Sequence, residues 1–257
     1  MSCTRDILDP DHISDLRRFT QSRVLLAFDY DGTLAPIAPL PDAAHLPPPT
    51  RSLLVNMATR YPLVVISGRA LVDISARVAG IGVREVFGNH GLERSGVASQ
   101  PRAQVRSWVR LLTEQLAEQP GVLVEDKLHS LSVHYRAAPD HEQALQSILP
   151  VVRTLPDVRV ICGAAAVNLL PRDDANKGVA LRRALEASGC DRAIYVGDDE
   201  TDEDAFAALP GDILLSIRIG SSMASQAGYH LDSQESIDLL LRVLINERND
   251  WAGAAAR

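Results

Sequence analysis

Short apolar runs that end in polar, glycine-containing turns recur along the chain. Five of these runs are continuous rather than alternating, which is typical of strands buried on both faces of a parallel sheet. They are VLLAFDYDG (24–32), PLVVISGR (62–69), REVFGNHG (84–91), AIYVGDDE (193–200) and DILLSIRIG (212–220). Four other segments carry apolar residues near helical spacing, so they are predicted as helices that cover the sheet. They are TRSLLVNMATR, RALVDISARVAG, NKGVALRRALEASG and ESIDLLLRVLINER.

The stretch from residue 99 to residue 172 has a different pattern. A helical segment (RAQVRSWVRLLTEQLAEQ) is followed by GVLVEDK and HSLSVHYR, and a second one (DHEQALQSILPVVRTL) by VRVICG and AAAVNLLP. In HSLSVHYR, Leu131, Val133 and Tyr135 alternate with polar residues, as in a strand with one exposed face. Helix–strand–strand twice over predicts an antiparallel sheet with helices on one face.

Together the two patterns predict an α/β protein with a doubly wound parallel-sheet core and an inserted α+β domain. We expect the core to comprise residues 1–98 and 173–257, and the inserted domain residues 99–172. In open sheets of this kind, ligands bind at the carboxyl ends of the strands. Each of the five runs ends in a polar cluster, so the candidate chemistry lies at that edge.

Composition narrows the classes of function. The 257 residues are 46% hydrophobic and 23% charged, the formal net charge is −7, and no basic block interleaves with aromatic residues. Nucleic-acid binding is therefore disfavoured. Cys3, Cys162 and Cys190 form no CxxC pair, and no run has the length of a membrane span or the character of a signal core. We expect a soluble, cytoplasmic protein with reduced thiols and neither a membrane nor a nucleic-acid partner. Its oligomeric state stays open, a monomer included.

Two carboxylates, Asp29 and Asp31, follow the first apolar run, and Gly32 lets the chain turn sharply after them. Buried carboxylates need a partner, because an ionised group without one is costly to bury. A calcium loop would require glycine at its sixth position and Glu at its twelfth, but here glycine is fourth and Leu40 is twelfth. A solvated turn after a strand remains an alternative for this stretch alone.

A second pair, Asp198 and Asp199, ends the strand that opens VGDDETDEDAF, and we expect Thr201 or Asp202 to cap the acidic helix that follows. Two strand-end carboxylate pairs in one sheet would repel each other without a cation. Carboxylate oxygens are hard ligands that suit Mg²⁺, and the cluster contains no His or Cys that would indicate zinc.

Phosphate-binding groups are expected at the same edge. Ser67 and Gly68 lie at a strand-to-helix turn, where a hydroxyl and free backbone N–H groups favour an anion. Lys177 begins a helix, where a cation opposes the macrodipole, so a ligand explains its position better than helix stability does. Each residue alone is more often a cap or a surface charge, but together with a metal they describe a phosphoryl pocket.

The order D-x-D-G-T-L, strand-end Ser, Lys and strand-end GDD resembles the signature of the haloacid dehalogenase-like (HAD) phosphatases. The finer spelling ISGR, GNHGLE, HYR, NKG and GDDETDEDAF, between about residues 24 and 220, is similar to the trehalose-6-phosphate phosphatase family. The resemblance implies a Rossmann-like, HAD-type core with a cap domain, and hydrolysis of a small-molecule sugar phosphate, trehalose 6-phosphate, through an aspartyl-phosphate.

The resemblance also implies roles for individual residues. Asp29 is expected as the nucleophile and Asp31 as the group that protonates the leaving oxygen and then activates water. The expected Mg²⁺ ligands are Asp29, Asp31 through its carbonyl, Asp198, and Asp199 directly or through water. The expected phosphate-binding residues are Thr33, Ser67, Gly68 and Lys177. The expected sugar-binding residues are Arg69, Asn89, His90, Glu93, Glu125, Lys127, Arg136 and Asn168.

One motif departs from the family pattern. In AAAVNLLPRDD, Asn168 and Leu170 stand where the family usually has a Glu and a basic residue before the proline. A different disaccharide or pseudo-disaccharide phosphate is therefore an alternative substrate. A phosphoryl-transferring mutase shares the core motifs, and a non-catalytic sugar-phosphate sensor would be marked by loss of Asp29 or Asp31, both of which are present. No GxSxG, Walker A or complete dinucleotide fingerprint occurs.

Overall fold

Strand β2 (Val24–Phe28) lies inside the main sheet, and all five of its residues are buried, as the continuous apolar run predicts. The computed structural model describes residues 5–38, 40–97, 103–163, 165–172, 176–220, 222 and 224–255. The chain divides into two compact units, one formed by residues 1–95 and 175–257 and the other by residues 96–174. The second unit is thus inserted into the first. Its role as a cap and the boundaries expected for it stay predictions.

The main sheet has eight strands, and every neighbouring pair is parallel except β4 and β5. Their spatial order is β1 (Arg5–Asp6), β12 (Tyr229–Leu231), β11 (Leu214–Ile219), β10 (Arg192–Gly197), β2, β3 (Leu63–Ile66), β4 (Glu85–Gly88) and β5 (Glu93–Arg94). From β2 the chain proceeds to β3 and β4 on one side, whereas β10, β11 and β12 lie on the other. The boundary between β2 and β10 is therefore the switch point at which ligands bind in doubly wound sheets.

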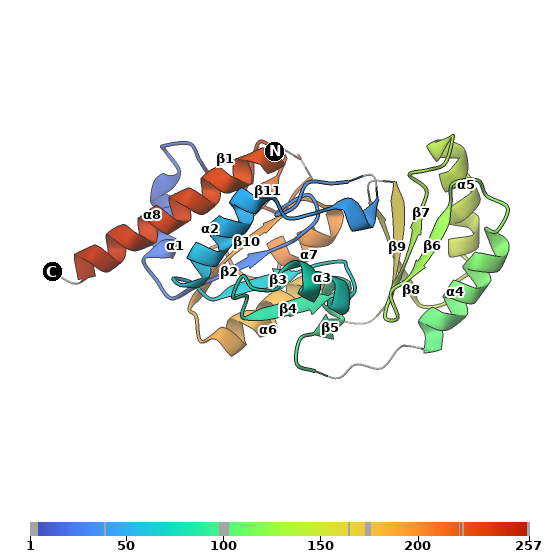
Figure 1. Ribbon diagram of the computed structural model, residues 1–257, viewed down its shortest axis with the longest axis horizontal. Helices are drawn as coiled ribbons and strands as arrows, with labels where there is room; N and C mark the ends of the chain where they lie inside the picture. Colours follow the sequence, from blue (N-terminus) through green and yellow to red (C-terminus); the bar gives the residue numbers. More distant parts are fainter. Residues whose placement is uncertain are drawn as a thin grey trace. The chain divides into compact units, whose positions relative to one another are not determined.

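Helices cover both faces of this sheet (Figure 1). One face packs against α1 (Ile13–Thr20), α2 (Pro48–Ala58), α3 (Leu71–Arg77) and α8 (Ile237–Ala255), and the other against α6 (Lys177–Ser188) and α7 (Glu203–Phe206). Among the residues that the structure describes, the single-turn 3₁₀ helices are η1 (Pro41–Ala43), η2 (Asn89–Gly91), η3 (Glu200–Asp202) and η4 (Gln234–Ser236).

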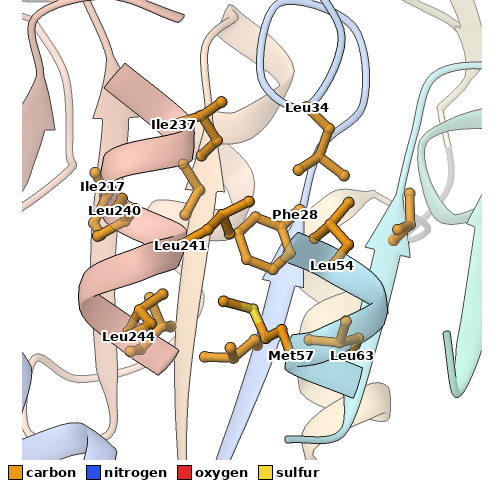
Figure 2. Close-up of a cluster of buried hydrophobic side chains, with 14 of the residues drawn as sticks. Phe28, Leu34, Leu54, Met57, Leu63, Ile217, Ile237, Leu240, Leu241 and Leu244 are labelled. Carbon is orange, nitrogen blue, oxygen red and sulfur yellow. The ribbon is translucent and has the colours of Figure 1, made fainter. Parts of the chain in front are cut away.

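Alternate residues of β2 serve the two hydrophobic layers. Leu26 and Phe28 belong to the cluster that contains α2 and α8, whereas Leu25 and Ala27 belong to the cluster that contains α6. Figure 2 shows Phe28 among the labelled side chains of α2 and α8. Because both faces of β2 are buried, the strand cannot carry the alternating polar residues that a half-exposed strand has.

The inserted unit repeats helix–strand–strand, as predicted. Its elements are α4 (Ala103–Gln115), β6 (Leu123–Asp126), β7 (Leu131–His134), α5 (His141–Val152), β8 (Val158–Gly163) and β9 (Ala166–Pro171). The sheet order is β6-β7-β9-β8, and every pair is antiparallel. One hydrophobic cluster joins the helices to the sheet, with Trp108 of α4 and Ile148 of α5 packed with Leu131 and Val133 of β7.

Two features lie outside the sequence prediction. The N-terminal segment forms β1 at the edge of the main sheet and α1 on its face, where Leu16 and Phe19 are buried. Its apolar positions are too few for a period to be recognised before the packing is known. Within the part of the chain that the structure describes, no helix combines the length and the apolar character needed to cross a membrane.

Candidate active site

Asp29 directly follows β2 at the switch point. Its backbone N–H donates to the carbonyl oxygen of Val196 on β10 at 2.9 Å, so the sheet ladder continues through this residue. The side chain is buried, and its Oδ1 lies 3.1 Å from Nζ of Lys177. A carboxylate in this position is held at the end of a central strand of the main sheet and has the counterion that its burial requires.

The turn after Asp29 brings a second carboxylate close. Gly32 has a φ of +78°, and a Cβ built on it would lie 2.1 Å from Oδ2 of Asp198. Only glycine fits there, because both the backbone conformation and the approach of Asp198 exclude a side chain. The hydroxyl of Thr33 donates to Oδ1 of Asp198 at 3.2 Å. The glycine of DYDGT thus serves the packing of this loop against the β10 loop as well as the turn.

Lys177 is the first residue of α6 and is almost fully buried. Its Nζ lies 2.8 Å from Asp202, 3.1 Å from Asp29 and 3.9 Å from Asp199. Burial alone lowers the pKa of a lysine, but the carboxylates of Asp202 and Asp29 outweigh it and hold the pKa of Lys177 well above its usual value. These carboxylates explain why a cation stands at a helix N-terminus. The helix itself is capped by Asn176, whose side chain accepts from Val179 N–H at 2.9 Å.

Asp202 occupies the expected N-cap position of α7, but its side chain makes no capping hydrogen bond there. Asp199 is the cap of η3, and its Oδ1 accepts from the backbone N–H of Thr201 at 2.7 Å and of Asp202 at 3.3 Å. The Asp202 side chain turns into the interior instead, where it is fully buried. Because the Lys177 ammonium lies there, an ion pair rather than solvent compensates the cost of burying this carboxylate.

Four hydrogen bonds saturate the Asp202 carboxylate. Its Oδ1 accepts from Nζ of Lys177 at 2.8 Å and from the hydroxyl of Tyr195 at 2.5 Å. Its Oδ2 accepts from the backbone N–H groups of Asp198 and Asp199, each at 3.0 Å. Asp202 therefore holds the backbone of the loop after β10 in place through these hydrogen bonds. It is a residue that reasoning from sequence missed, because a run of acids resembles a solvated helix start.

The cluster carries more negative than positive charge. Burial, followed by the proximity of Asp202 and Asp199, raises the pKa of Asp198 to about 8. Burial also raises the pKa of Asp29, although Lys177 opposes it. Burial likewise raises the pKa of Asp199, but Lys177 and the Thr201 hydroxyl outweigh it, so the pKa of Asp199 lies below its usual value. A further cation near Asp29 and Asp198 would favour their ionised forms and lower both pKa values.

The residues present fit a hard divalent cation. Carboxylate oxygens of Asp29, Asp198 and Asp202 all lie within 4.8 Å of one another, so one ion can reach them. The donor set is oxygen only, which suits Mg²⁺. Since Asp202 already accepts four hydrogen bonds, Asp29 and Asp198 are the carboxylates with the capacity to bind a metal.

Asp31 is two residues from Asp29 but has a different environment. Its side chain is 39% exposed and makes a bidentate pair with Arg69, at 2.7 Å from Nε and 2.6 Å from Nη2. Arg69 also donates to Asp73 on α3 at 2.7 Å, and Arg77 donates to the other oxygen of Asp73 at 2.7 Å. The two carboxylates thus differ in exposure, because Asp29 is buried and Asp31 is partly exposed to solvent.

The loops after β3 and β4 meet at the same edge. Ser67 is buried and its hydroxyl oxygen accepts from Arg69 N–H at 3.2 Å, while a Cβ on Gly68 would lie 2.5 Å from the His90 ring. Asn89 donates to Glu93, and Glu93 also accepts from Leu71 N–H at 3.0 Å. The sugar contacts expected of these residues, and the phosphate contacts of Ser67 and Gly68, stay predictions.

In the inserted unit, polar residues form a row on the sheet face opposite its helices. Glu125, Ser132 and Asn168 are register neighbours on β6, β7 and β9, and the Ser132 hydroxyl donates to Asn168 Oδ1 at 2.6 Å. Lys127 lies 3.7 Å from Glu125, whose Oε2 also lies 2.7 Å from Nε2 of His134.

His134 and Ser132 were not among the expected site residues, although His134 belongs to the HYR motif. For Arg136, the structure places its carbonyl oxygen 3.1 Å from the His141 ring. Alternation along β7 is the signal that could have found Ser132 and His134, since both occupy the face opposite Leu131 and Val133.

A family model described as trehalose-phosphatase matches residues 27–235, which include both units. The chain belongs to the trehalose-phosphatase family. The match spans the Asp29 turn, the Ser67 loop, Lys177 and the Asp198 loop, so the core site and the inserted unit belong to one family pattern.

Individual relatives agree with this membership. The chain is 34% identical over 228 residues to a trehalose-phosphate phosphatase of Mycobacterium marinum, a match that covers 81% of this chain and 58% of that protein. It is 28% identical over 261 residues to a probable trehalose-phosphate phosphatase of Oryza sativa subsp. japonica, covering 91% and 71%. The chain thus spans little more than half the length of the mycobacterial relative.

Solved structures show the same fold. The C-terminal domain of C. albicans trehalose-6-phosphate phosphatase superposes with a TM-score of 0.79 at 24% identity, covering 95% of this chain and 98% of that one. The likeness extends over nearly the whole chain, so the HAD-like α/β architecture of the trehalose-phosphatase family is common to both.

Proposed function

We propose that this chain is a phosphoric monoester hydrolase that releases phosphate from trehalose 6-phosphate. The observation that carries the proposal is the Asp29 carboxylate, buried at the switch point of the sheet and 3.1 Å from the Lys177 ammonium. A carboxylate so placed can attack phosphorus, and a cation beside it can take the charge of the phosphoryl oxygens. The named activity of the relatives supports the choice of sugar.

In the proposed reaction, an Asp29 oxygen bonds to phosphorus as the bond between phosphorus and the sugar oxygen breaks. Asp31, on the solvent side of the site, donates its proton to that leaving oxygen. Water then attacks the phosphorus of the aspartyl-phosphate while Asp31 takes its proton. Inorganic phosphate is released, and the Asp29 carboxylate and the proton on Asp31 are restored, so the cycle consumes only the sugar phosphate and water.

The remaining groups would hold the phosphoryl group and a metal. Lys177, the Ser67 hydroxyl and the Gly68 backbone would receive phosphoryl oxygens, and Thr33 would support the loop through its bond to Asp198. Asp29, Asp198 and the Asp31 carbonyl would hold Mg²⁺, with Asp199 alongside. The ion would supply positive charge against the phosphoryl oxygens.

The inserted unit is proposed as a cap domain that recognises the sugar. Its row of Glu125, Ser132 and Asn168 presents a carboxylate, a hydroxyl and an amide on one sheet face, and Lys127 adds a cation. Such groups can match the many hydroxyls of a disaccharide. Arg136 is proposed as a further sugar contact in this unit, and Arg69, Asn89, His90 and Glu93 as contacts from the larger unit.

A panel of sugar phosphates tests the substrate. Phosphate release should be fastest from trehalose 6-phosphate, should require Mg²⁺, and should fall when EDTA removes it. A rate no higher than that with glucose 6-phosphate would refute the proposed substrate while leaving a phosphatase in place.

Replacing the nucleophile tests the chemistry. Asp29→Asn should abolish phosphate release, because the amide cannot form the acyl phosphate, and it should retain the wild-type circular dichroism spectrum. Asp191→Asn is the matched control, since Asp191 is exposed and pairs only with arginine at the surface. Hydroxylamine-labile phosphate on acid-quenched wild type, absent from Asp29→Asn, would report the intermediate. Substantial turnover by Asp29→Asn would refute the assignment.

A second candidate substrate is another disaccharide phosphate. The side-chain oxygen of Asn168 accepts a hydrogen bond from the Ser132 hydroxyl, and Leu170 is buried, so neither presents the charge usual for the family at these positions. If the absence of the carboxylate usual at position 168 weakens the binding of trehalose, Asn168→Glu should lower KM for trehalose 6-phosphate with kcat little changed. An unchanged KM would show that Asn168 does not weaken the binding of trehalose and would remove this argument for a different substrate.

A further inference from the structure

A cavity of about 350 Å³ opens at the end of the main sheet opposite Asp29. Its walls include Leu214 and Tyr229, the first residues of β11 and β12, whereas Asp29 and Asp198 follow the last residues of β2 and β10. Because these strands are parallel, the cavity and the candidate active site lie at opposite ends of them. The volume is within the range of small-molecule sites.

Two guanidinium groups line this cavity. Arg18 of α1 and Arg5 of β1 are exposed, and within the described part of the chain neither side chain forms an ion pair. Arg5 stacks on the Tyr229 ring at 4.7 Å and Arg18 lies 5.5 Å from the centre of the Phe19 ring. Both are thus placed by aromatic contacts that leave their N–H groups available for an anion.

The one carboxylate in the lining is already engaged. Asp15 accepts a hydrogen bond from the Tyr229 hydroxyl at 2.6 Å. Burial and this bond raise the pKa of Tyr229 to about 12, while Arg5 and Arg18 oppose the rise, so both guanidinium groups act on the same spot. Two guanidinium groups against one carboxylate leave the lining with a net positive charge, on a chain whose net charge is −7.

Part of the remaining wall is apolar. Phe19, Phe206, Leu209 and Leu214 contribute to it, beside the polar side chains of Ser216 and Gln226. The apolar part can contact a flat apolar body, whereas the arginines bind a carboxylate, phosphate or phosphonate through paired N–H groups. A bare inorganic anion would leave the apolar part unused.

We propose that this cavity is a second ligand site, which binds a small organic anion with a flat apolar body. The site does not depend on the proposed phosphatase activity, because none of its groups belongs to the Asp29 cluster. It uses the N-terminal β1 and α1, to which the sequence assigned no function.

Calorimetry with the full chain and two probes tests the site, in EDTA so that the active site holds no metal. Phenylphosphonate and benzoate should both bind with a stoichiometry of one, and the tighter of the two identifies the preferred anion. Inorganic phosphate and benzyl alcohol, which each carry half of the recognition, should bind at least about tenfold more weakly. No binding of either aromatic anion would overturn the proposal, as would phosphate binding as tightly as phenylphosphonate.

Matched variants locate the bound probe. Arg18→Ala should weaken binding by about tenfold, since it removes charged hydrogen bonds to the anion. Arg17→Ala, on the same helix but paired with Glu247 at 2.8 Å outside the cavity, should bind as wild type does. Gly211→Leu should block binding, because a Cβ there meets no atom within 4 Å and the side chain can fill the space without strain. Equal binding by wild type, Arg18→Ala and Gly211→Leu would refute the site.

Discussion

The Lys177 ammonium lies among buried carboxylates. We therefore expect Lys177 to contribute to the stability of the fold as well as to the proposed reaction. Lys177→Met keeps much of the volume but leaves Asp29 and Asp202 buried without their cation. Breaking a buried pair in this way costs about 3–5 kcal/mol. We expect the free energy of unfolding, measured by urea denaturation at neutral pH, to fall by that order.

The exposed pair of Arg23 with Asp191 is the control for this change. The two side chains are 71% and 57% exposed and lie 2.8 Å apart, so solvent screens their attraction. Arg23→Met should leave the urea midpoint nearly unchanged. If the two variants lose equal stability, the Lys177 cluster does not have the buried electrostatic character that its contacts indicate.

Gly32 links backbone conformation to the site. Gly32→Ala would place a methyl group 2.1 Å from Asp198 Oδ2 and force that carboxylate away, at a positive φ of 78°. We expect a loss of roughly 100-fold or more in phosphate release, since a displacement of about 1 Å in a site has effects of this size. The assay is initial rate at saturating Mg²⁺ and substrate.

Gly189 separates the two causes, because it has a φ of +71° at the end of α6 but no atom within 4 Å of a built Cβ. Gly189→Ala should cost about 1 kcal/mol through backbone strain and leave phosphate release unchanged. A Gly32→Ala protein as active as Gly189→Ala would show that the approach of Asp198 to this turn is not needed.

At the scale of elements, the N-terminus of α6 is the support of the site. Asn176 caps the helix whose first residue is Lys177. Asn176→Ala should lower the free energy of unfolding by about 1 kcal/mol through loss of the cap. It should also lower kcat, because the Lys177 ammonium loses its fixed position. Asp140 caps α5 of the inserted unit in the same way, through Gln143 N–H at 3.0 Å. Asp140→Ala should lower stability with kcat preserved. An equal effect of both variants on kcat would contradict this role of α6.

The elements also differ in how far sequence could predict them. The runs that form β2, β3, β4, β10 and β11 are continuous and apolar, so the sequence predicts that these strands are buried on both faces. In contrast, β1 has two residues and β12 has three, and each is held in place by its neighbours in the sheet. Such short strands carry too little period to be predicted, because their stability comes from partners distant in the chain.

At the scale of the whole molecule, all five tyrosines have pKa values raised above their usual range, in each case by burial first. Folding therefore favours the neutral phenols, and this stabilisation is complete below the unfolded pKa of about 10 and lost as pH rises through the folded values. Absorbance of tyrosinate should titrate at higher pH in the native protein than in urea. Tyr229→Phe should remove the component near pH 12.

A native titration that coincides with the one in urea would mean that these rings are not buried as described. The hydrogen bond of Tyr229 to Asp15 and that of Tyr195 to Asp202 join residues 214 and 7 positions apart in the chain, and only the first crosses between distant segments. The high-pH behaviour thus reports packing in both units, since Tyr135 lies in the inserted unit and the other four tyrosines in the larger one.

The sequence by itself determined the α/β class, the insertion and the carboxylate pairs at the ends of two strands, because periodicity and strand-end chemistry are local properties. Tertiary structure decided what faces what. The sequence predicts Thr201 or Asp202 as a helix cap, but the fold places Lys177 beside Asp202 and buries this carboxylate in an ion pair. Asp31 and Asp29 differ because Arg69 and Lys177 reach them from other segments. Burial and counterions are set by residues far apart in the chain, so the charge state and the partner of a carboxylate follow from packing.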